Sequence, residues 1–208
     1  PDKRMVGGYK QDEIEFHKVQ ILDPATGTGT FLTEVIKQIH QKFAGQQGIW
    51  SRYVDEHLIP RLNGFELLMA SYAMAHLKLD LLLTETGYKP AQSATQRDQR
   101  FKIFLTNSLE EANPDETLPL LAFMRELTIE GLEASKVKNE TPVMVILGNP
   151  PYSGISTNNG KWISDLIENY KYIEGEHFKE RKHWLGDDYV KFLRFGQHFI
   201  DKNGEGVL

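Results

Sequence analysis

The chain alternates short runs of apolar residues with longer segments in which apolar residues recur at helical spacing. Residues 19–22 form the first apolar run, and after a glycine-rich turn Phe31, Val35, Ile36 and Ile39 recur on one face of a helix. This pattern predicts a strand, a loop and a helix, in that order.

The same alternation continues along the chain and predicts three more strands and three more helices. The strands are expected at residues 62–66, 102–105 and 143–147, and the helices at 67–83, 118–137 and 187–200. Polar stretches at 45–48, 89–100 and 111–117 are expected to be loops. Apolar strands that alternate with helices are typical of a mostly parallel sheet with helices on both faces, so we predict an α/β fold.

Two details of the pattern lead to further expectations. The helix over 67–83 carries Ala and Leu on every side, which predicts that it is buried. Residues 204–208 form a turn followed by two apolar residues and are expected to open another strand. Because the first Met is Met5 and the end falls at this strand, both ends are expected to be cut from a longer polypeptide.

Composition narrows the class of protein. The 208 residues are 40% hydrophobic and 25% charged, which excludes collagen-like, coiled-coil and wholly disordered chains. No apolar run approaches the roughly 20 residues that span a bilayer, so no membrane partner is expected. The chain has no Cys, which excludes disulfides and thiolate chemistry and fits a cytoplasmic location. The seven His residues lack metal-ligand spacing, and we predict no metal site.

The net charge of −5 bears on nucleic-acid binding. A self-sufficient DNA-binding domain is expected to carry a bulk positive field, which this chain lacks. Any contact with DNA must therefore be local or supplied by parts outside these residues.

The turn after the first predicted strand carries the first candidate chemistry. Asp23 ends the strand, and Gly27 and Gly29 precede the helix, at the place where open α/β sheets bind ligands. Glycines allow close approach of the backbone, and the free N–H groups of the helix favour an anionic group. A dinucleotide fingerprint would need a third glycine where Leu32 stands, which disfavours nicotinamide cofactors. The turn alone is also compatible with a purely structural role.

Glu66 ends the second predicted strand and is the expected companion of this turn. A carboxylate at that place can accept hydrogen bonds from both hydroxyls of a ribose. A solvated Glu at a strand end is the alternative interpretation.

The second candidate motif follows the apolar strand at 143–147. There Asn149, Pro150, Pro151 and Tyr152 form an NPPY tetrapeptide, in which the prolines fix the backbone as it leaves the sheet. The Asn carboxamide oxygen and a proline carbonyl offer two acceptors to an amino group, such as the exocyclic NH2 of adenine, and would stabilise positive charge as its nitrogen is alkylated. Tyr152 could stack on the base, a contact worth ~1–3 kcal/mol. A plain exit turn is the alternative.

Three segments together carry a family resemblance. DPATGTGTFL at 23–32, GFELLMASYAMAHLKL at 64–79 and NPPYS at 149–153, in this order, resemble the N6-adenine DNA methyltransferases of bacterial restriction-modification systems. The later segments 156–159, 180–182 and 188–192 resemble more narrowly the type ISP enzymes, single polypeptides that join nuclease, helicase, methyltransferase and target-recognition parts.

The resemblance implies a Rossmann-like S-adenosylmethionine-dependent methyltransferase core that fills residues 1–208 as one domain, without the later strands and the target-recognition domain. The positions that would bind S-adenosylmethionine are Asp23, Pro24, Ala25, Thr26, Gly27, Gly29, Phe31, Glu66, Asn107 and Leu109. The catalytic positions would be Asn149, Pro150, Pro151 and Tyr152, and Tyr152, Ser153 and Phe192 would hold a flipped adenine of double-stranded DNA.

Within that set, the resemblance assigns the methionine part of the cofactor to Asp23 and the glycine turn, and the ribose to Glu66. Asn107 stands where the family often has an Asp that contacts the cofactor adenine, and Thr26 where many members have Cys. The upstream aromatic motif that normally completes the methionine pocket is not found.

Two other functions remain open at the level of the sequence. A related methyltransferase could place a glutamine side-chain amide or an amino group of RNA in the same pocket, because the acceptor pair recognises an NH2 group alone. A noncatalytic segment of a restriction assembly would also fit the acidic charge.

Overall fold

A four-stranded parallel sheet forms the centre of the computed structural model, which describes residues 2–4, 14–90, 100–111, 122–152, 154, 156–177 and 183–208. The strands are β3 (Gln20–Asp23), β4 (Leu62–Glu66), β5 (Lys102–Leu105) and β6 (Val143–Ile146). Their order is β5-β4-β3-β6, and every neighbouring pair is parallel. The four predicted strands and the α/β class are confirmed.

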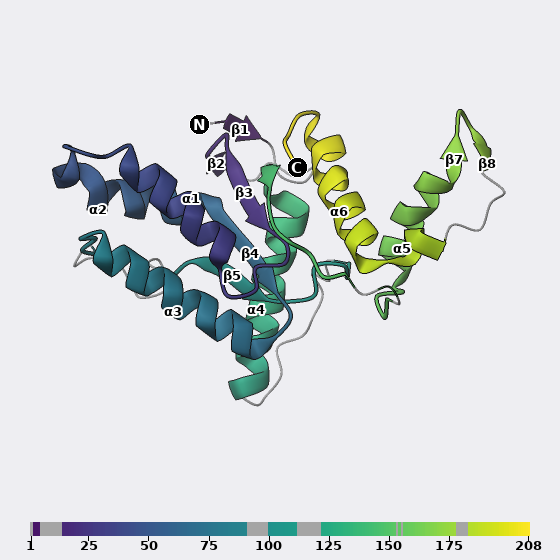
Figure 1. Cartoon of the computed structure of the whole chain (residues 1–208), viewed down its shortest axis with the longest axis horizontal. Helices are drawn as coiled ribbons and strands as arrows, with labels where there is room; N and C mark the ends of the chain where they lie inside the picture. Colours follow the sequence, from purple (N-terminus) through teal and green to yellow (C-terminus); the bar gives the residue numbers. More distant parts are fainter. Residues whose placement is uncertain are drawn as a thin grey trace.

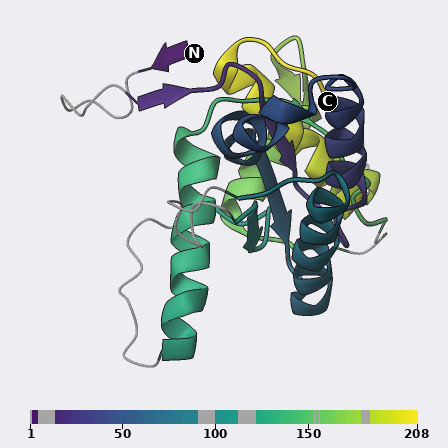
Figure 2. The same ribbon diagram turned by 90° about the vertical axis from the view of Figure 1, so that its left-hand side faces the viewer.

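Six α-helices accompany the sheet in the described part of the chain. They are α1 (Thr30–Gln41), α2 (Trp50–Tyr53), α3 (Met69–Glu85), α4 (Ala122–Glu140), α5 (Lys161–Glu168) and α6 (Asp188–Asn203). Helices α1–α3 cover one face and α4–α6 the other (Figures 1 and 2). Each face has its own apolar cluster, built around Leu32, Trp50 and Leu79 on the first and around Phe65, Phe195 and Phe199 on the second.

Short elements that the apolar pattern did not predict complete the described part of the chain. Short helical turns flank α2 and follow α5, namely η1 (Gln47–Ile49), η2 (Val54–Leu58), η3 (Ile59–Arg61), η4 (Asn169–Lys171) and η5 (His183–Gly186). Two small antiparallel ribbons pair β1 (Asp2–Arg4) with β2 (Ile14–Phe16) and β7 (Tyr172–Ile173) with β8 (Glu176–His177).

The C-terminal residues extend the sheet beyond β6. Gly204 ends α6 with a φ of 82°, and Val207 then bridges to Val145 in parallel. The Val207 N–H donates to the carbonyl of Met144 at 2.8 Å, and the Ile146 N–H donates to the carbonyl of Val207 at 2.9 Å. The expectation that residues 204–208 open another strand is confirmed as a single bridge.

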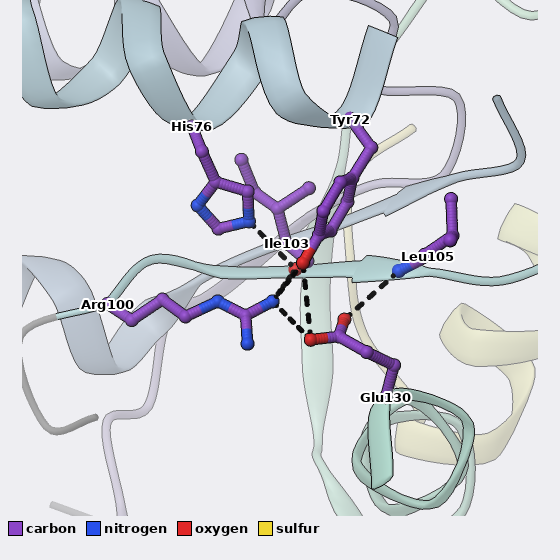
Figure 3. A network of polar contacts seen from close by, with 6 residues as sticks. All are labelled: Tyr72, His76, Arg100, Ile103, Leu105 and Glu130. Carbon is purple, nitrogen blue, oxygen red and sulfur yellow. Dashed lines mark hydrogen bonds and ion pairs between the residues drawn. The ribbon is translucent and has the colours of Figure 1, made fainter. Parts of the chain in front are cut away.

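Strand β5 lies at the edge of the sheet, and side chains satisfy its outward-facing backbone groups (Figure 3). The Leu105 N–H donates to Glu130 of α4 at 3.2 Å, and Glu130 is itself paired with Arg100. His76 of α3 donates a hydrogen bond to the carbonyl of Ile103 at 3.2 Å, and burial lowers the pKa of its imidazole. Covering an edge in this way removes a template for pairing with other strands.

Helix α3 corrects the prediction that it would be buried on every side. Leu79 is fully buried against the sheet, whereas Met69, Met74, Leu77 and Leu81 are each 49–56% exposed. The reason is geometric: the sheet covers only one side of a helix, and within the described residues no second layer lies over the outer side of α3 (Figure 1).

The two sides of α3 predict opposite responses to truncation. Leu79→Ala should lower the free energy of unfolding by about 2–5 kcal/mol, because it leaves a cavity in the first apolar cluster. Leu77→Ala, the matched control on the exposed side, should change it by less than about 0.5 kcal/mol. Chemical denaturation of both variants measures the difference, and equal losses would contradict the placement of α3.

Candidate functional site

The carboxyl ends of all four strands meet at one edge of the sheet. Asp23 ends β3, Glu66 ends β4, Asn107 follows β5 and Asn149 follows β6. Strand β3 pairs with β4 on one side and with β6 on the other, so the strand order reverses at β3. Ligands of open α/β sheets bind outside such a switch point. The structure therefore brings four sequence-predicted positions to the edge that suits a ligand.

The turn after β3 is built around two glycines in the left-handed region. Gly27 has a φ of 55° and Gly29 a φ of 77°, a conformation that residues with a side chain rarely adopt. A β-carbon on Gly29 would also lie 3.3 Å from the β-carbon of Ala75, so α1 begins in close contact with α3. Thr26 is buried and fixes the turn, because its N–H donates to the Phe65 carbonyl at 3.0 Å and its hydroxyl donates to the Asp23 carbonyl at 3.0 Å.

Glu66 reaches this turn from the neighbouring strand. Its two carboxylate oxygens each accept a backbone N–H, from Gly27 at 2.7 Å and from Leu68 at 2.8 Å. Gly27 and Glu66 lie 39 residues apart in the sequence. Each oxygen of a carboxylate has a further lone pair, so Glu66 can hold the turn and still accept from a ligand.

Asp23 is the most enclosed acidic group of the site. Its side chain has 0% exposure; Oδ1 accepts the Ala25 N–H at 3.1 Å, and Oδ2 has no hydrogen-bond partner among the described residues. Burial raises the pKa of Asp23 to about 7; the Ala25 N–H opposes this shift and the negative charge of Glu66 adds to it. An unpaired buried carboxylate oxygen beside a second carboxylate suits a ligand that brings N–H or O–H donors or a positive charge.

Two residues that sequence reasoning missed shape the surroundings of Asp23. A β-carbon on Gly148 would lie 2.8 Å from Asp23 Oδ1, so only glycine lets the chain after β6 pass this carboxylate. The Ser108 hydroxyl donates to the carbonyl of Pro24 at 2.5 Å and ties the loop after β5 to the turn after β3. The glycine directly before NPPY was a visible signal, whereas nothing in the sequence singles out Ser108.

Asn107 heads a tightly bonded loop after β5. Its Oδ1 accepts the Leu109 N–H at 3.0 Å, and its Nδ2 donates to Glu110 at 3.1 Å and to Asn158 at 2.8 Å. Leu109 is 1% exposed and its side chain belongs to the second apolar cluster, so it anchors the loop in the core.

Lys138 of α4 supports the same loop and was also missed. Its ammonium donates to the carbonyls of Asn107 at 2.8 Å and Glu110 at 2.9 Å. Burial lowers the pKa of Lys138 to about 8. In the sequence Lys138 is one of two lysines near the end of a polar helix, with no pattern that distinguishes it.

The remaining predicted cofactor positions differ in their exposure. Pro24 is buried and Ala25 half-buried within the turn, and Phe31 on the first turn of α1 is 42% exposed. Phe31 therefore offers an apolar surface beside the glycine turn.

The NPPY segment forms an exposed ledge beyond β6. Asn149 and Pro151 are exposed and Pro150 is half-buried. Tyr152 is 73% exposed and stacks on Tyr189 of α6, with ring centroids 4.8 Å apart and planes 16° apart. Because the side chain of Asn149 is open to solvent, its carboxamide can bond an incoming group.

Phe192 and Ser153 are the other two residues predicted for the base pocket. Phe192 is half-buried and packs against the second apolar cluster, while Tyr189, three residues earlier on α6, faces Tyr152. Ser153 lies outside the described residues. Sequence reasoning missed Tyr189 because it could not fix which face of α6 looks toward the ledge.

Two other kinds of feature are absent from the described part of the chain. Its residues contain no group of three or more His, Cys, Asp or Glu side chains that could hold a metal ion. None of the described helices is long and apolar enough to cross a membrane.

Comparisons with known proteins find likeness in structure rather than in sequence. No family model matches the chain, and no curated protein matches it. The ATP-dependent Type ISP restriction-modification enzyme LlaBIII bound to DNA is similar with a TM-score of 0.63 and 22% identity, over 88% of this chain and 12% of that one. A nuclease-deletion mutant of the Type ISP restriction-modification enzyme LlaGI with a DNA substrate mimic gives 0.65 and 24%, over 91% and 15%.

A DrdV–DNA complex is also similar, with a TM-score of 0.61 and 28% identity over 91% of this chain and 17% of that one. The chain thus spans only 12–17% of the length of these three neighbours. The likeness shows a Rossmann-like α/β fold.

The buried Asp23 carboxyl predicts a distinct pH dependence of stability. Because its pKa is about 7 in the folded chain and 3.8 in an unstructured peptide, the folded state binds the proton more tightly between these values, and the free energy of unfolding falls as the pH rises through this window. Asp23→Asn should remove this fall, which is on the order of a few kcal/mol at ~1.4 kcal/mol per pKa unit.

Chemical denaturation of the parent chain and of the Asp23→Asn variant, each at about pH 5 and about pH 8, measures how much the free energy of unfolding changes between the two conditions. Asp165→Asn, which alters an exposed carboxylate paired with Lys161, is the control and should keep the parental slope. An Asp23→Asn slope equal to that of the parent would contradict the raised pKa.

Proposed function

We propose that this chain is the S-adenosylmethionine-dependent core of a DNA methyltransferase that acts on N6 of adenine within a restriction-modification system. The observation that carries the proposal is the convergence of Asp23 and Glu66 on the glycine turn, one strand away from the NPPY ledge. The proposed cofactor site and the proposed acceptor site for an amino group would thus share one edge of the sheet. The structural likeness of this chain to Type ISP restriction-modification enzymes supports placing it in a restriction-modification system.

The donor set of the site fits this cofactor. S-adenosylmethionine would supply a methyl group on a positively charged sulfonium. Asp23 has a free buried Oδ2 that would accept from the α-ammonium group, and the remaining lone pairs of Glu66 would accept from the ribose hydroxyls. Gly27 and Gly29 keep side chains away from the ligand. Glu66 and the ionised form of Asp23 also place negative charge where the bound molecule would carry positive charge.

At the ledge, the chain's own groups would polarise the target. The Asn149 carboxamide oxygen and the Pro150 carbonyl are the acceptors for the two hydrogens of an adenine NH2. The lone pair of that nitrogen is delocalised into the ring, and the two fixed acceptors would stabilise the positive charge that develops on the nitrogen as it is methylated. The fixed backbone of the two prolines holds both acceptors in place and supplies the positioning.

Tyr152 and Tyr189 would form the stacking side of the base pocket. N6 lies within the stack of a DNA duplex, so an enzyme that methylates it must extrude the nucleotide. Tyr152 offers a largely exposed ring, and Tyr189 supports its other face. Because the net charge of the chain is −5, we expect most contacts to the DNA backbone to come from target-recognition, nuclease or helicase parts of a longer polypeptide.

The cofactor assignment predicts selective binding that depends on Glu66. Titration calorimetry should show binding of S-adenosylmethionine but not of NAD, and Glu66→Gln should weaken it by about 10–100-fold, the usual worth of a hydrogen bond to a charged group. Glu34→Gln on the exposed side of α1 is the matched control and should bind like the parent. Equal affinity for NAD, or an unchanged Glu66→Gln variant, would contradict the proposal.

The target assignment predicts a separation of binding from transfer. Asn149→Ala should reduce methyl transfer to duplex DNA by at least about 100-fold, as loss of a preorganised charge-stabilising group does, with S-adenosylmethionine affinity unchanged. Asn139→Ala at the exposed end of α4 is the control. The assay uses a polypeptide that includes the target-recognition region, with RNA and a glutamine peptide as competing acceptors. Full methyl transfer to DNA by Asn149→Ala would point to a noncatalytic role for this chain. Preference of the parent for RNA or for the glutamine peptide would point to another substrate class.

A further inference from the structure

A loop directly after the NPPY ledge is fixed by two buried charged residues of α6. Lys191 is 4% exposed and Asp188 is 7% exposed, and neither belongs to the proposed cofactor or base contacts. The Lys191 ammonium donates to Ser156 Oγ at 2.8 Å, to the Asn158 carbonyl at 2.5 Å and to Asn159 Oδ1 at 3.3 Å. All three ammonium hydrogens thus have acceptors on one short loop.

Asp188 bonds the same loop from the adjacent turn of α6. Its Oδ1 accepts from the Ser156 hydroxyl and from Asn158 Nδ2, the latter at 3.0 Å. Ser156 Oγ in turn accepts the Asn158 N–H at 3.0 Å. We call these five residues, Ser156, Asn158, Asn159, Asp188 and Lys191, the polar clasp.

Asn158 extends the clasp to the cofactor side of the site. Its Oδ1 accepts from Asn107 Nδ2 at 2.8 Å, although the two residues lie 51 positions apart. Asn107 belongs to the loop after β5, on which the proposed cofactor site depends. A continuous set of hydrogen bonds therefore runs from Lys191 through Asn158 to Asn107.

The same end of α6 also holds the ledge. The Asp187 carboxylate caps the helix by accepting the Tyr189 N–H at 2.8 Å and also accepts the Gly154 N–H at 2.9 Å. Tyr189 stacks on Tyr152. One helical turn thus contacts the base-side residues and the clasp together.

Energetics favour a positioning role over simple packing. A buried ammonium is costly to desolvate, and apolar side chains of similar volume often stabilise a fold equally well. Buried charges with complete hydrogen bonding instead fix one arrangement of their partners. The clasp therefore specifies where the loop stands relative to Asn107.

We propose that the polar clasp couples the cofactor half of the site to the target-base half, with Lys191, Asp188 and Asn158 as positioning residues. The identity of the two ligands, the cofactor and the target base, rests on the proposed function. The hydrogen bonds of the polar clasp do not depend on it. Order imposed on Asn107 by the cofactor passes through Asn158 to the end of α6, which carries Tyr189 against Tyr152. Such coupling is a free energy shared by two sites.

Hydrogen exchange of the ligand-free 208-residue chain tests the contacts themselves. In Asn158→Ala and in Lys191→Met, peptides that cover 106–110 and 156–160 should exchange about tenfold faster than in the parent, because each loop loses its partner. Lys161→Met, which alters an exposed lysine of α5, should change neither peptide. Faster exchange confined to 156–160 would overturn the coupling. If Lys191→Met does not fold, Asn158→Ala decides the same point.

Addition of S-adenosylmethionine then tests the coupling through the ligand. In the parent, exchange should slow in both 106–110 and 156–160, and in Asn158→Ala it should slow in 106–110 alone. Equal slowing of both peptides in Asn158→Ala would overturn the proposal. If the parent does not bind S-adenosylmethionine, the proposed function fails, and the ligand-free comparison still decides whether the clasp joins the two loops.

Discussion

The parallel pairing of β3 with β4 on one side and β6 on the other is the constraint on which the site depends. Parallel strands end at the same edge, so the pairing gathers residues that lie far apart in the sequence. It places Asp23 between Glu66 and the NPPY ledge, and Gly148 lets the chain pass close to the Asp23 carboxylate. The hydrogen bond from Gly27 to Glu66 then locks the turn onto the neighbouring strand.

This arrangement has an energetic cost that the ligand could offset. Asp23 is buried with one oxygen unpaired among the described residues, and a second carboxylate stands nearby. Such acceptors destabilise the ligand-free chain and strengthen the binding of a molecule that brings donors and positive charge. Local destabilisation at the site thus follows from the same residues that give it affinity.

The sequence predicted the sheet well because its strands are short, continuous apolar runs bounded by polar turns. It also predicted the positions of Asp23, Glu66 and Asn149, since strand ends in an α/β pattern face one edge. It could not settle what depends on a packing partner. Apolar periodicity cannot tell whether a second layer covers α3, and it cannot show that Tyr189 of α6 stacks on Tyr152. Lys138 and Lys191 look like solvated lysines until the carbonyls around them are known.

The exposed side of α3 affects the solubility of the 208-residue chain. Met74, Leu77 and Leu81 present a row of half-exposed apolar groups to water. Attraction between such surfaces is driven by the release of water, and it strengthens on warming and in kosmotropic salts. Sulfate and mild heating should therefore lower the solubility of this chain well before they loosen its sheet.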